Sequence, residues 1–179
     1  RAMDGKPPRS CHYTGSIALE NQVDTPGVAN HFPAEFMSAT PHRLPGYAHL
    51  RGEGLEIGAF NHPAELPVGC RVRYFDVMTV DEATSRFPEM DPDGFVPPDV
   101  LGDLDRDGLA QLEAKSCSFV ILNHVLEHVA NPIAVLREIY RLIGEDGLLV
   151  ISVPDKNYTY DRAREVTTWE HLFREYLEE

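Results

Sequence analysis

The sequence predicts an α/β domain built on a doubly wound, mostly parallel sheet. Strand-like apolar runs alternate with turn-rich or helical connections from residue 54 to the end of the chain, and no internal repeat interrupts them. The run at residues 118–122 is almost wholly apolar, as expected for a strand buried on both faces of a parallel sheet. This alternation is typical of layered folds in which helices cover a parallel sheet.

Composition restricts the classes of partner and compartment. The 179 residues fit one domain, and 16 Lys and Arg against 29 Asp and Glu give a net charge of −13. This charge argues against nucleic acid or an anionic membrane surface as a partner, because phosphate binding requires clustered cations. The three widely spaced cysteines form no C-x-x-C pair, which favours the reducing cytoplasm. No apolar run is long enough for membrane insertion, and the oligomeric state stays open.

The chain divides into two predicted regions. Residues 1–51 are interrupted repeatedly by proline, so we interpret them as an irregular N-terminal extension or lid. Residues 52–179 carry the regular pattern of the α/β domain.

The first half of that domain contains three predicted strands. The first, at 54–58, ends in Gly58, and the second, at 71–76, is rich in β-branched and aromatic residues and ends in Asp76. A helix is expected at 81–87, a short third strand at 99–103 and a brief helix at 109–113.

The second half has the strongest local signals. The buried strand at 118–122 precedes Asn131 and Pro132, which are favoured at the cap and first turn of a helix. An apolar stripe continues this helix to Gly144. A fifth strand follows at 148–153, and a charged amphipathic helix is expected at 167–178.

Polar residues and one glycine follow the predicted strands. In parallel sheets, ligands bind outside the carboxyl ends of the strands. Asp76 lies 18 positions after Gly58, close to the spacing at which an acidic residue holds a ribose diol in nucleotide-binding units. Asp103 and the pair Asn123 and His124 end the third and fourth strands. Each residue alone is compatible with a simple turn or cap, but their shared placement favours a nucleotide site.

Five segments carry a resemblance to a known family. The motifs GLEIGA at 54–59, YFD at 74–76 and ILNHVLEHVANP at 121–132 resemble the class I S-adenosylmethionine-dependent methyltransferases, which are Rossmann-like. The segments at 147–161 and 167–172 resemble a type-11-like branch found near bacterial glycosyltransferases.

The resemblance implies S-adenosylmethionine as the cofactor and a role for each matching residue. Glu56 and Gly58 would line its methionine end, and Asp76 would hold the ribose hydroxyls. Asp103 and Leu104 would face the adenine. Asn123 and His124 would lie beneath the methyl-bearing sulfonium.

The sequence departs from the family pattern in two places. The usual G-x-G-x-G loop is replaced by Gly58 followed by Ala59, Phe60 and Asn61, which implies a wider loop or weaker cofactor binding. The family's sixth and seventh strands have no counterpart before residue 179. The domain is then either C-terminally truncated or ends on its fifth strand as an edge.

A second interpretation attaches to His124, Glu127 and His128, which match the H-x-x-E-H signature of inverted zinc proteases. On a helix, the two histidines would share one face. Because the motif directly follows a buried strand, we expect it to bend through a strand-to-helix turn and to bind no metal.

The chemistry of methyl transfer assigns further candidates. If the acceptor is a hydroxyl, a base must remove its proton, and His124 is the first candidate, with His128 and His171 behind it. Asp155 and Asp161 follow the fifth strand and would orient a polyol. Gene neighbourhood in the resembling branch points to glycan biosynthesis and hence to a small-molecule or sugar hydroxyl as acceptor. The alternative is an inactive, cofactor-binding scaffold domain.

Overall fold

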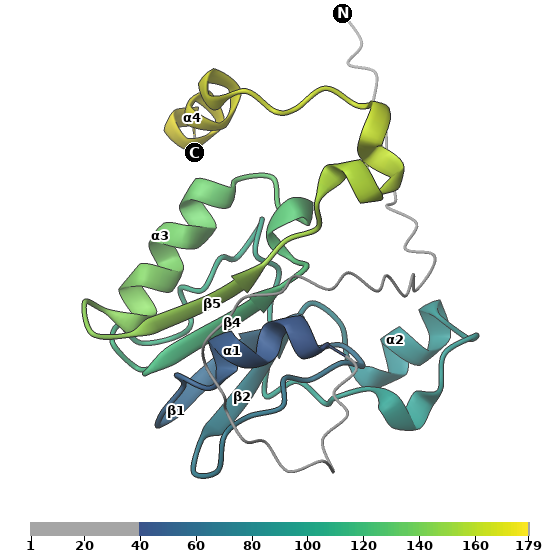
Figure 1. Ribbon diagram of the computed structural model, residues 1–179, viewed down its shortest axis with the longest axis vertical. Coiled ribbons are helices and arrows are strands. Elements are labelled where there is room, and N and C mark those ends of the chain that lie inside the picture. The colour runs from purple at the N-terminus through teal and green to yellow at the C-terminus, as the bar shows by residue number, and fades with distance from the viewer. Residues whose placement is uncertain (1–39, 179) are drawn as a thin grey trace, which may run out of the picture. The chain divides into compact units, whose positions relative to one another are not determined.

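The computed structural model describes residues 40–178. Its sheet has five parallel strands in the order β3-β2-β1-β4-β5 (Figure 1). The strands are β1 (Glu53–Ile57), β2 (Arg71–Asp76), β3 (Val100–Leu101), β4 (Phe119–Asn123) and β5 (Leu148–Ser152). The chain therefore forms the predicted α/β, Rossmann-like fold, in which the strand order reverses beside β1.

Residues 40–178 also contain four α-helices and five short 3₁₀ turns, which precede, connect or follow the strands. The helices are α1 (Leu44–Tyr47), α2 (Val80–Arg86), α3 (Pro132–Ile143) and α4 (Trp169–Glu178). The turns are η1 (Pro41–Arg43), η2 (Pro92–Gly94), η3 (Leu126–His128), η4 (Lys156–Tyr158) and η5 (Tyr160–Ala163).

Strand β4 lies between β1 and β5, and its apolar sequence is buried on both sides. Val120 and Leu122 belong to the larger core cluster, which also contains residues of β1, β2 and α3. Phe119 and Ile121 point to the opposite face and form a smaller cluster with Tyr47 and Leu50. This alternation follows from the two-residue period of a strand.

Helix α3 covers one face, and its boundaries follow the local sequence. The Asn131 side chain accepts a hydrogen bond from the backbone N–H of Ala134 at 3.0 Å, and Gly144 ends the helix with φ of +68°. Val135, Ile139 and Leu142 are buried against the sheet. The predicted helix from Asn131 to Gly144 is confirmed.

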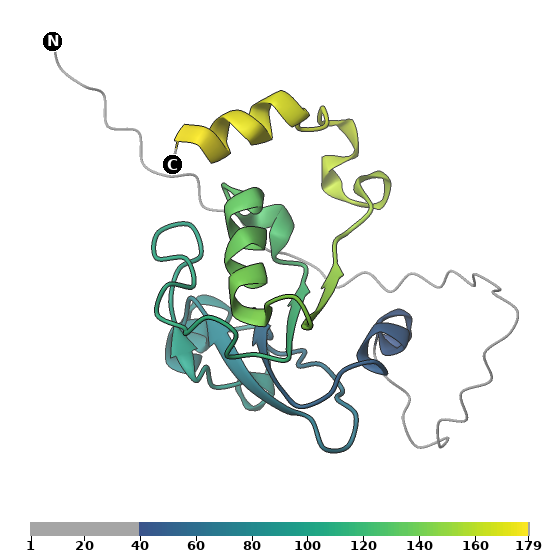
Figure 2. The same cartoon turned by 90° about the vertical axis from the view of Figure 1, so that its left-hand side faces the viewer.

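The opposite face is covered by residues that precede the first strand. Tyr47 of α1 and Leu50 are buried there, so α1 and α3 lie on opposite sides of the sheet (Figure 2). The predicted extension at 1–51 thus contributes Tyr47 and Leu50 to the core. Residues 1–39 of that extension lie outside the described residues, and the boundary at 51 and 52 stays a prediction.

The brief helix predicted at 109–113 is wrong, because these residues form turns. Leu109 and Leu112 are buried in the core, and their carbonyl oxygens accept hydrogen bonds from the Arg141 guanidinium, each at 2.8 Å. The Arg141 side chain thus satisfies both carbonyls, so the segment does not need the backbone hydrogen bonds of a helix to satisfy them.

Two further sequence observations can be compared with the described residues. Cys70 and Cys117 are free thiols, and Cys11 lies outside the part of the chain that the structure describes. Between residues 40 and 178, no helix has the length and hydropathy needed to cross a membrane.

The contact between β1 and β4 depends on the absence of a side chain at Gly54. A Cβ built there overlaps the Phe119 ring, so Gly54→Ala should lower the free energy of unfolding by about 1–3 kcal/mol, as expected for overpacking. Gly94→Ala is the control, since its added Cβ would lie 3.9 Å from the nearest side-chain atom. Urea denaturation measures both, and equal stabilities for the two variants would contradict the packing argument.

Candidate active site

Backbone hydrogen bonds hold the carboxyl ends of the strands at one edge of the sheet. The N–H of Gly58 donates to the Phe75 carbonyl at 2.9 Å, and that of Gly102 donates to Asp76 at 3.0 Å. The N–H of His124 donates to the Ser152 carbonyl at 2.9 Å. The residues that follow the five strands therefore lie at a single edge of the sheet, which is the edge where we expect the ligand to bind.

The loop after β1 keeps a left-handed backbone without the usual second glycine. Gly58 has φ of +69°, and a Cβ there would lie 2.6 Å from Val125 Cγ2. Phe60 stands at the position of the second glycine in G-x-G-x-G and has φ of +51°, which is uncommon for a bulky residue. Its ring packs edge-on against Phe87 and Phe95, at centroid distances of 5.2 and 4.8 Å. This aromatic packing offsets the strain of the left-handed conformation.

Asp76 ends β2 and turns part of its carboxylate toward the backbone. Its Oδ1 accepts hydrogen bonds from the N–H of Val77 at 2.7 Å and of Met78 at 3.3 Å. Burial raises the pKa of Asp76, while the backbone amides of Val77, Met78 and Phe60 lower it. A carboxylate has lone pairs for about four hydrogen bonds, so Asp76 retains capacity to accept bonds from a diol.

Glu56 lies within β1, and its side chain is fully enclosed, with 2% exposure. Both carboxyl oxygens accept the N–H of Ala64, at 3.1 and 3.0 Å. Burial raises the pKa of Glu56 to about 7, against the lowering effects of the Ala64 amide and the charge of Arg43. Glu56 therefore anchors the segment after the glycine loop, and its predicted contact with the methionine end of the cofactor stays a prediction.

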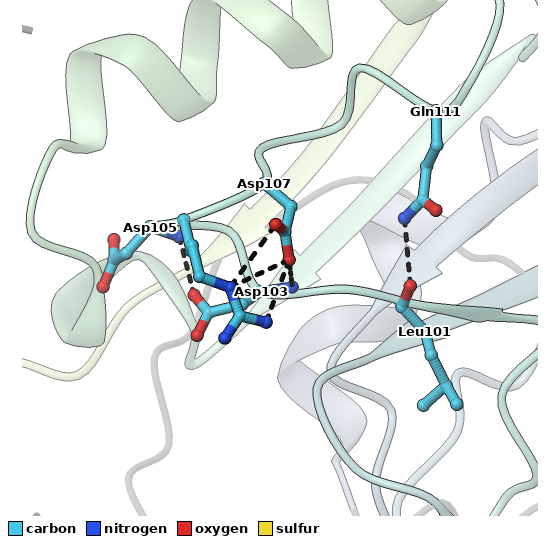
Figure 3. A network of polar contacts seen from close by, with 6 residues as sticks. Leu101, Asp103, Asp105, Asp107 and Gln111 are labelled. Atoms are coloured by element: carbon cyan, nitrogen blue, oxygen red, sulfur yellow. Dashed lines mark hydrogen bonds and ion pairs between the residues drawn. The ribbon is translucent and has the colours of Figure 1, made fainter.

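Asp103 and Leu104 begin a tight turn after β3. The Asp103 side chain accepts the N–H of Asp105 at 2.9 Å (Figure 3). The Asp103 carbonyl accepts the N–H of Asp107 at 2.7 Å. Leu104 packs partly buried against the larger core cluster. Asp105 in turn accepts the N–H of Ala130 at 2.8 Å, which connects this turn to the segment after η3. The predicted adenine contacts of Asp103 and Leu104 remain untested.

Asn123 ends β4 and is clamped between two neighbours. Its Nδ2 donates to the Tyr47 hydroxyl at 2.8 Å, and its Oδ1 accepts the Ser152 hydroxyl at 2.7 Å. Both sides of the amide are thus used within the protein, which leaves one N–H for a ligand. The network also ties the helical turn α1 to the ends of β4 and β5.

His124 follows with φ of +54°, and the H-x-x-E-H segment bends here as predicted. The 3₁₀ turn η3 replaces the helix on which His124 and His128 would have shared a face. Glu127 Oε1 instead lies 3.4 Å from His124 Nδ1 and 3.9 Å from His128 Nε2. Among residues 40–178, no group of three or more potential ligands is arranged to hold a metal. The zinc-protease interpretation thus lacks the helix that it requires.

A cleft of about 410 Å³ lies beside this turn. Its polar lining residues are Glu127, Thr167, His171 and Glu175. His171 Nε2 lies 3.0 Å from Glu175 Oε1, one helical turn along α4. The cleft thus joins His171, a predicted acceptor residue, to Glu127, which contacts His124. Gly58, Asp76 and Asp103 are not among its described lining residues.

The two aspartates after β5 are engaged in local contacts. Asp155 Oδ1 accepts the N–H of Asn157 at 2.9 Å, and Asp161 Oδ1 accepts a hydrogen bond from Arg164 at 2.8 Å. Both side chains cap short 3₁₀ turns or pair on the exposed surface. The structure does not bring them into the cleft, and their role toward an acceptor remains a prediction.

Sequence reasoning missed the partners of Asn123. Ser152 was detectable, because it lies near the end of the predicted fifth strand as Asn123 lies at the end of the fourth, and the two are paired in the sheet. Tyr47 carried no such signal, since it precedes the first strand in a proline-rich segment. Arg43 was missed for the same reason, and its buried Nε has no hydrogen-bond partner among the described atoms.

The residues at the strand ends fit a nucleoside cofactor. Gly58 has a left-handed backbone and no side chain where the loop after β1 passes Val125, and Asp76 presents a partly buried carboxylate at the same edge. These are the features expected for close backbone approach and for hydrogen bonding to a ribose diol.

The raised pKa of Glu56 predicts a pH-dependent stability. In the unfolded chain this carboxyl ionises near 4.5, and in the folded chain near 7. The unfolded state loses its proton first, so the free energy of unfolding should fall by roughly 3 kcal/mol between these values as pH rises, then level off. Glu56→Gln should abolish this contribution, whereas Glu53→Gln, with a side chain 73% exposed in the same strand, should keep it. Identical slopes in wild type and Glu56→Gln, from urea denaturation across this range, would refute the assignment.

Three solved methyltransferase structures have low similarity to this chain. A S-adenosylmethionine-dependent methyltransferase from Aquifex aeolicus is 13% identical with a TM-score of 0.48, over 73% of each chain. Phosphoethanolamine N-methyltransferase 2 from Haemonchus contortus, in complex with S-adenosyl-L-methionine, is 17% identical with a TM-score of 0.45, over 76% of this chain and 35% of its own. The trans-methyltransferase CalH, in complex with S-adenosylhomocysteine, is 25% identical with a TM-score of 0.41, over 64% and 36%.

The chain spans about a third of the length of the last two structures. A comparison with curated proteins finds no match. The model of the family described as "Methyltransferase domain" matches residues 29–178, and S-adenosylmethionine is the cofactor that the sequence predicts for such a domain. Because this match spans most of the sequence, the chain belongs to the methyltransferase domain family.

Proposed function

We propose that this domain transfers a methyl group from S-adenosylmethionine to a hydroxyl of a small molecule, sugar or glycan, with His124 as the general base. The observation that carries the proposal is the placement of His124. It directly follows the buried strand β4, at the edge where Gly58 and Asp76 also lie, and its side chain is 37% exposed. A histidine at this edge is accessible to an acceptor, and imidazole is the side chain most often used as a general base.

The cofactor would be held by residues from three strand ends. Gly58 offers close backbone approach, Asp76 accepts hydrogen bonds from the ribose hydroxyls, and Asn123 offers its remaining N–H. When bound, S-adenosylmethionine supplies a methyl group that is electrophilic because it is attached to a sulfonium. Binding both reactants in line would promote the transfer, since alignment alone can lower a barrier by about 7–11 kcal/mol.

Glu127 positions the proposed base. Its Oε1 lies 3.4 Å from His124 Nδ1, so the carboxylate favours a proton on that nitrogen. The other ring nitrogen, Nε2, is then free to accept the proton of an acceptor hydroxyl. The left-handed backbone at His124 directs the chain from the strand into η3, which brings Glu127 back toward the ring.

The finer assignments rest on the sequence. The resemblance at 147–161 and 167–172 supports the type-11-like branch and, with it, a bacterial glycan pathway and a sugar hydroxyl. His128, Asp155, Asp161 and His171 are the proposed acceptor-binding residues. The cysteine usage supports a cytoplasmic location.

Cofactor binding can be tested at Asp76. Asp76→Asn keeps an oxygen for the Val77 and Met78 amides but loses the charge, so affinity for S-adenosylhomocysteine should fall by about 1–3 kcal/mol. Titration calorimetry measures the affinity, and Asp146→Asn, an exposed residue at the opposite end of β5, serves as the matched control. Unchanged affinity in Asp76→Asn, with the fold intact, would remove Asp76 from the site.

The base can be tested with His124→Asn. Asparagine tolerates φ near +54°, so the backbone should keep its turn while the base is lost. Turnover on an accepted hydroxyl substrate should fall by about 10²–10⁴, with affinity for S-adenosylhomocysteine nearly unchanged.

His49→Asn, an exposed residue preceding β1, controls for loss of a histidine in general. Melting temperature, affinity and turnover are measured on the same samples. A lower melting temperature with wild-type turnover per folded molecule would show that His124 only packs in the turn.

A further inference from the structure

We propose that the cleft beside η3 and α4 is the acceptor subsite and that it selects a molecule carrying an ammonium group on an apolar skeleton. This inference rests on the proposed function and narrows its acceptor class. An amino alcohol, an aminophenol or a hydrophobic amino sugar fits the proposed function and this inference together, because each combines a hydroxyl nucleophile with a cation.

The charge of the cleft carries the proposal. Two carboxylates line it, Glu127 with a side chain 23% exposed and Glu175 with one 40% exposed. None of its described lining residues is a lysine or arginine. A concave surface with one sign of charge and low-dielectric walls concentrates ligands of the opposite sign. The cleft is therefore suited to a cation and unfavourable for a phosphate or carboxylate.

The apolar residues of the lining determine which kind of molecular body should carry the ammonium group. The apolar lining residues include Leu126, Val129, Val153 and Leu172. Apolar walls stabilise hydrocarbon and offer few hydrogen bonds to the many hydroxyls of an unsubstituted sugar. The acceptor should accordingly pair its ammonium with an aliphatic or aromatic body.

Helix α4, which contributes Glu175 to the cleft lining, is held by contacts with Asn131 and with α3. Asn131 Nδ2 donates to the Glu175 backbone carbonyl at 3.3 Å. On the neighbouring residue of α4, the Tyr176 hydroxyl accepts a hydrogen bond from Arg137 at 3.4 Å, and the Tyr176 ring lies 5.5 Å from that guanidinium. Arg137, the nearby cation of α3, is thus engaged by Tyr176 and is not part of the cleft lining.

The two carboxylates have different neighbours, which separates substrate binding from catalysis. Glu127 lies next to His124 and also positions the base. Glu175 pairs with His171 at 3.0 Å on α4 and has no role in orienting His124. Glu175→Gln therefore removes charge from the cleft, keeps an oxygen for His171, and leaves the base with its own partner.

The experiment compares acceptors matched except for charge. Tyramine and 2-(4-hydroxyphenyl)ethanol share a phenolic hydroxyl and an aromatic ring, but only tyramine carries an ammonium group. The second pair, 2-phenylethylamine and 2-phenylethanol, has the same difference in charge and no phenolic hydroxyl. Dissociation constants are measured by ligand-observed magnetic resonance with saturating S-adenosylhomocysteine. In the wild type each amine should bind at least about tenfold more tightly than its alcohol, as expected for a charge-assisted contact.

Glu175→Gln should reduce this preference by roughly tenfold, and Glu127→Gln should do the same. Glu170→Gln, on the same helix but outside the cleft lining, should leave it intact. Melting temperatures establish that each variant is folded. The inference is wrong if neither amine binds more tightly than its alcohol, or if Glu170→Gln and Glu175→Gln lower the preference equally.

The readout also separates this inference from the proposed function. Cofactor binding with no preference for amines overturns only the acceptor class. A preference for amines without affinity for S-adenosylhomocysteine overturns the methyltransferase proposal and leaves the cation site standing.

Discussion

The burial of β4 on both faces is the constraint on which the rest of the domain depends. Four of its five residues are fully buried, and its pairing with β1 and β5 aligns the ends of all three strands. A shift of one residue would turn Val120 and Leu122 away from α3 and place Phe119 and Ile121 against it. The same register determines where Asn123 and His124 emerge. The site is thus positioned by core packing before any ligand contact is considered.

Two close contacts connect the end of β4 to the neighbouring segments and so fix the positions of the loops. The Asn123 amide binds Tyr47 and Ser152, so the end of β4 is tied to α1 on one side and to β5 on the other. Val125 lies so near Gly58 that a Cβ there would be only 2.6 Å from it. The loops after β1 and β4 therefore constrain each other. The positive φ values at Gly58, Phe60 and His124 occur where backbone strain is commonly retained, in loops held by the surrounding structure.

The sequence predicted most of the frame because the signals there are local. The apolar run at 118–122, the Asn131 cap and Gly144 each specify an element through neighbouring residues, and all three are found. The error at 109–113 has a long-range cause, since Arg141 on α3 supplies the hydrogen bonds to Leu109 and Leu112. Tyr47 was beyond reach for the same reason, because its partner Asn123 lies 76 positions away. Local patterns therefore located the strands to within about two residues, with β3 ending at Leu101 and not at Asp103 as predicted, but they did not reveal the network that fixes the strand ends.

The H-x-x-E-H segment shows how one backbone angle changes the meaning of a motif. On a helix, His124, Glu127 and His128 would form the start of a metal site. With His124 at φ of +54° and a 3₁₀ turn behind it, both imidazoles instead approach the same carboxylate oxygen of Glu127. In the proposed mechanism, this shared carboxylate orients the base and contributes negative charge to the adjoining cleft. The residue types match a metal-binding motif, whereas their conformation after β4 fits the role that we propose for His124, a base beside the acceptor cleft.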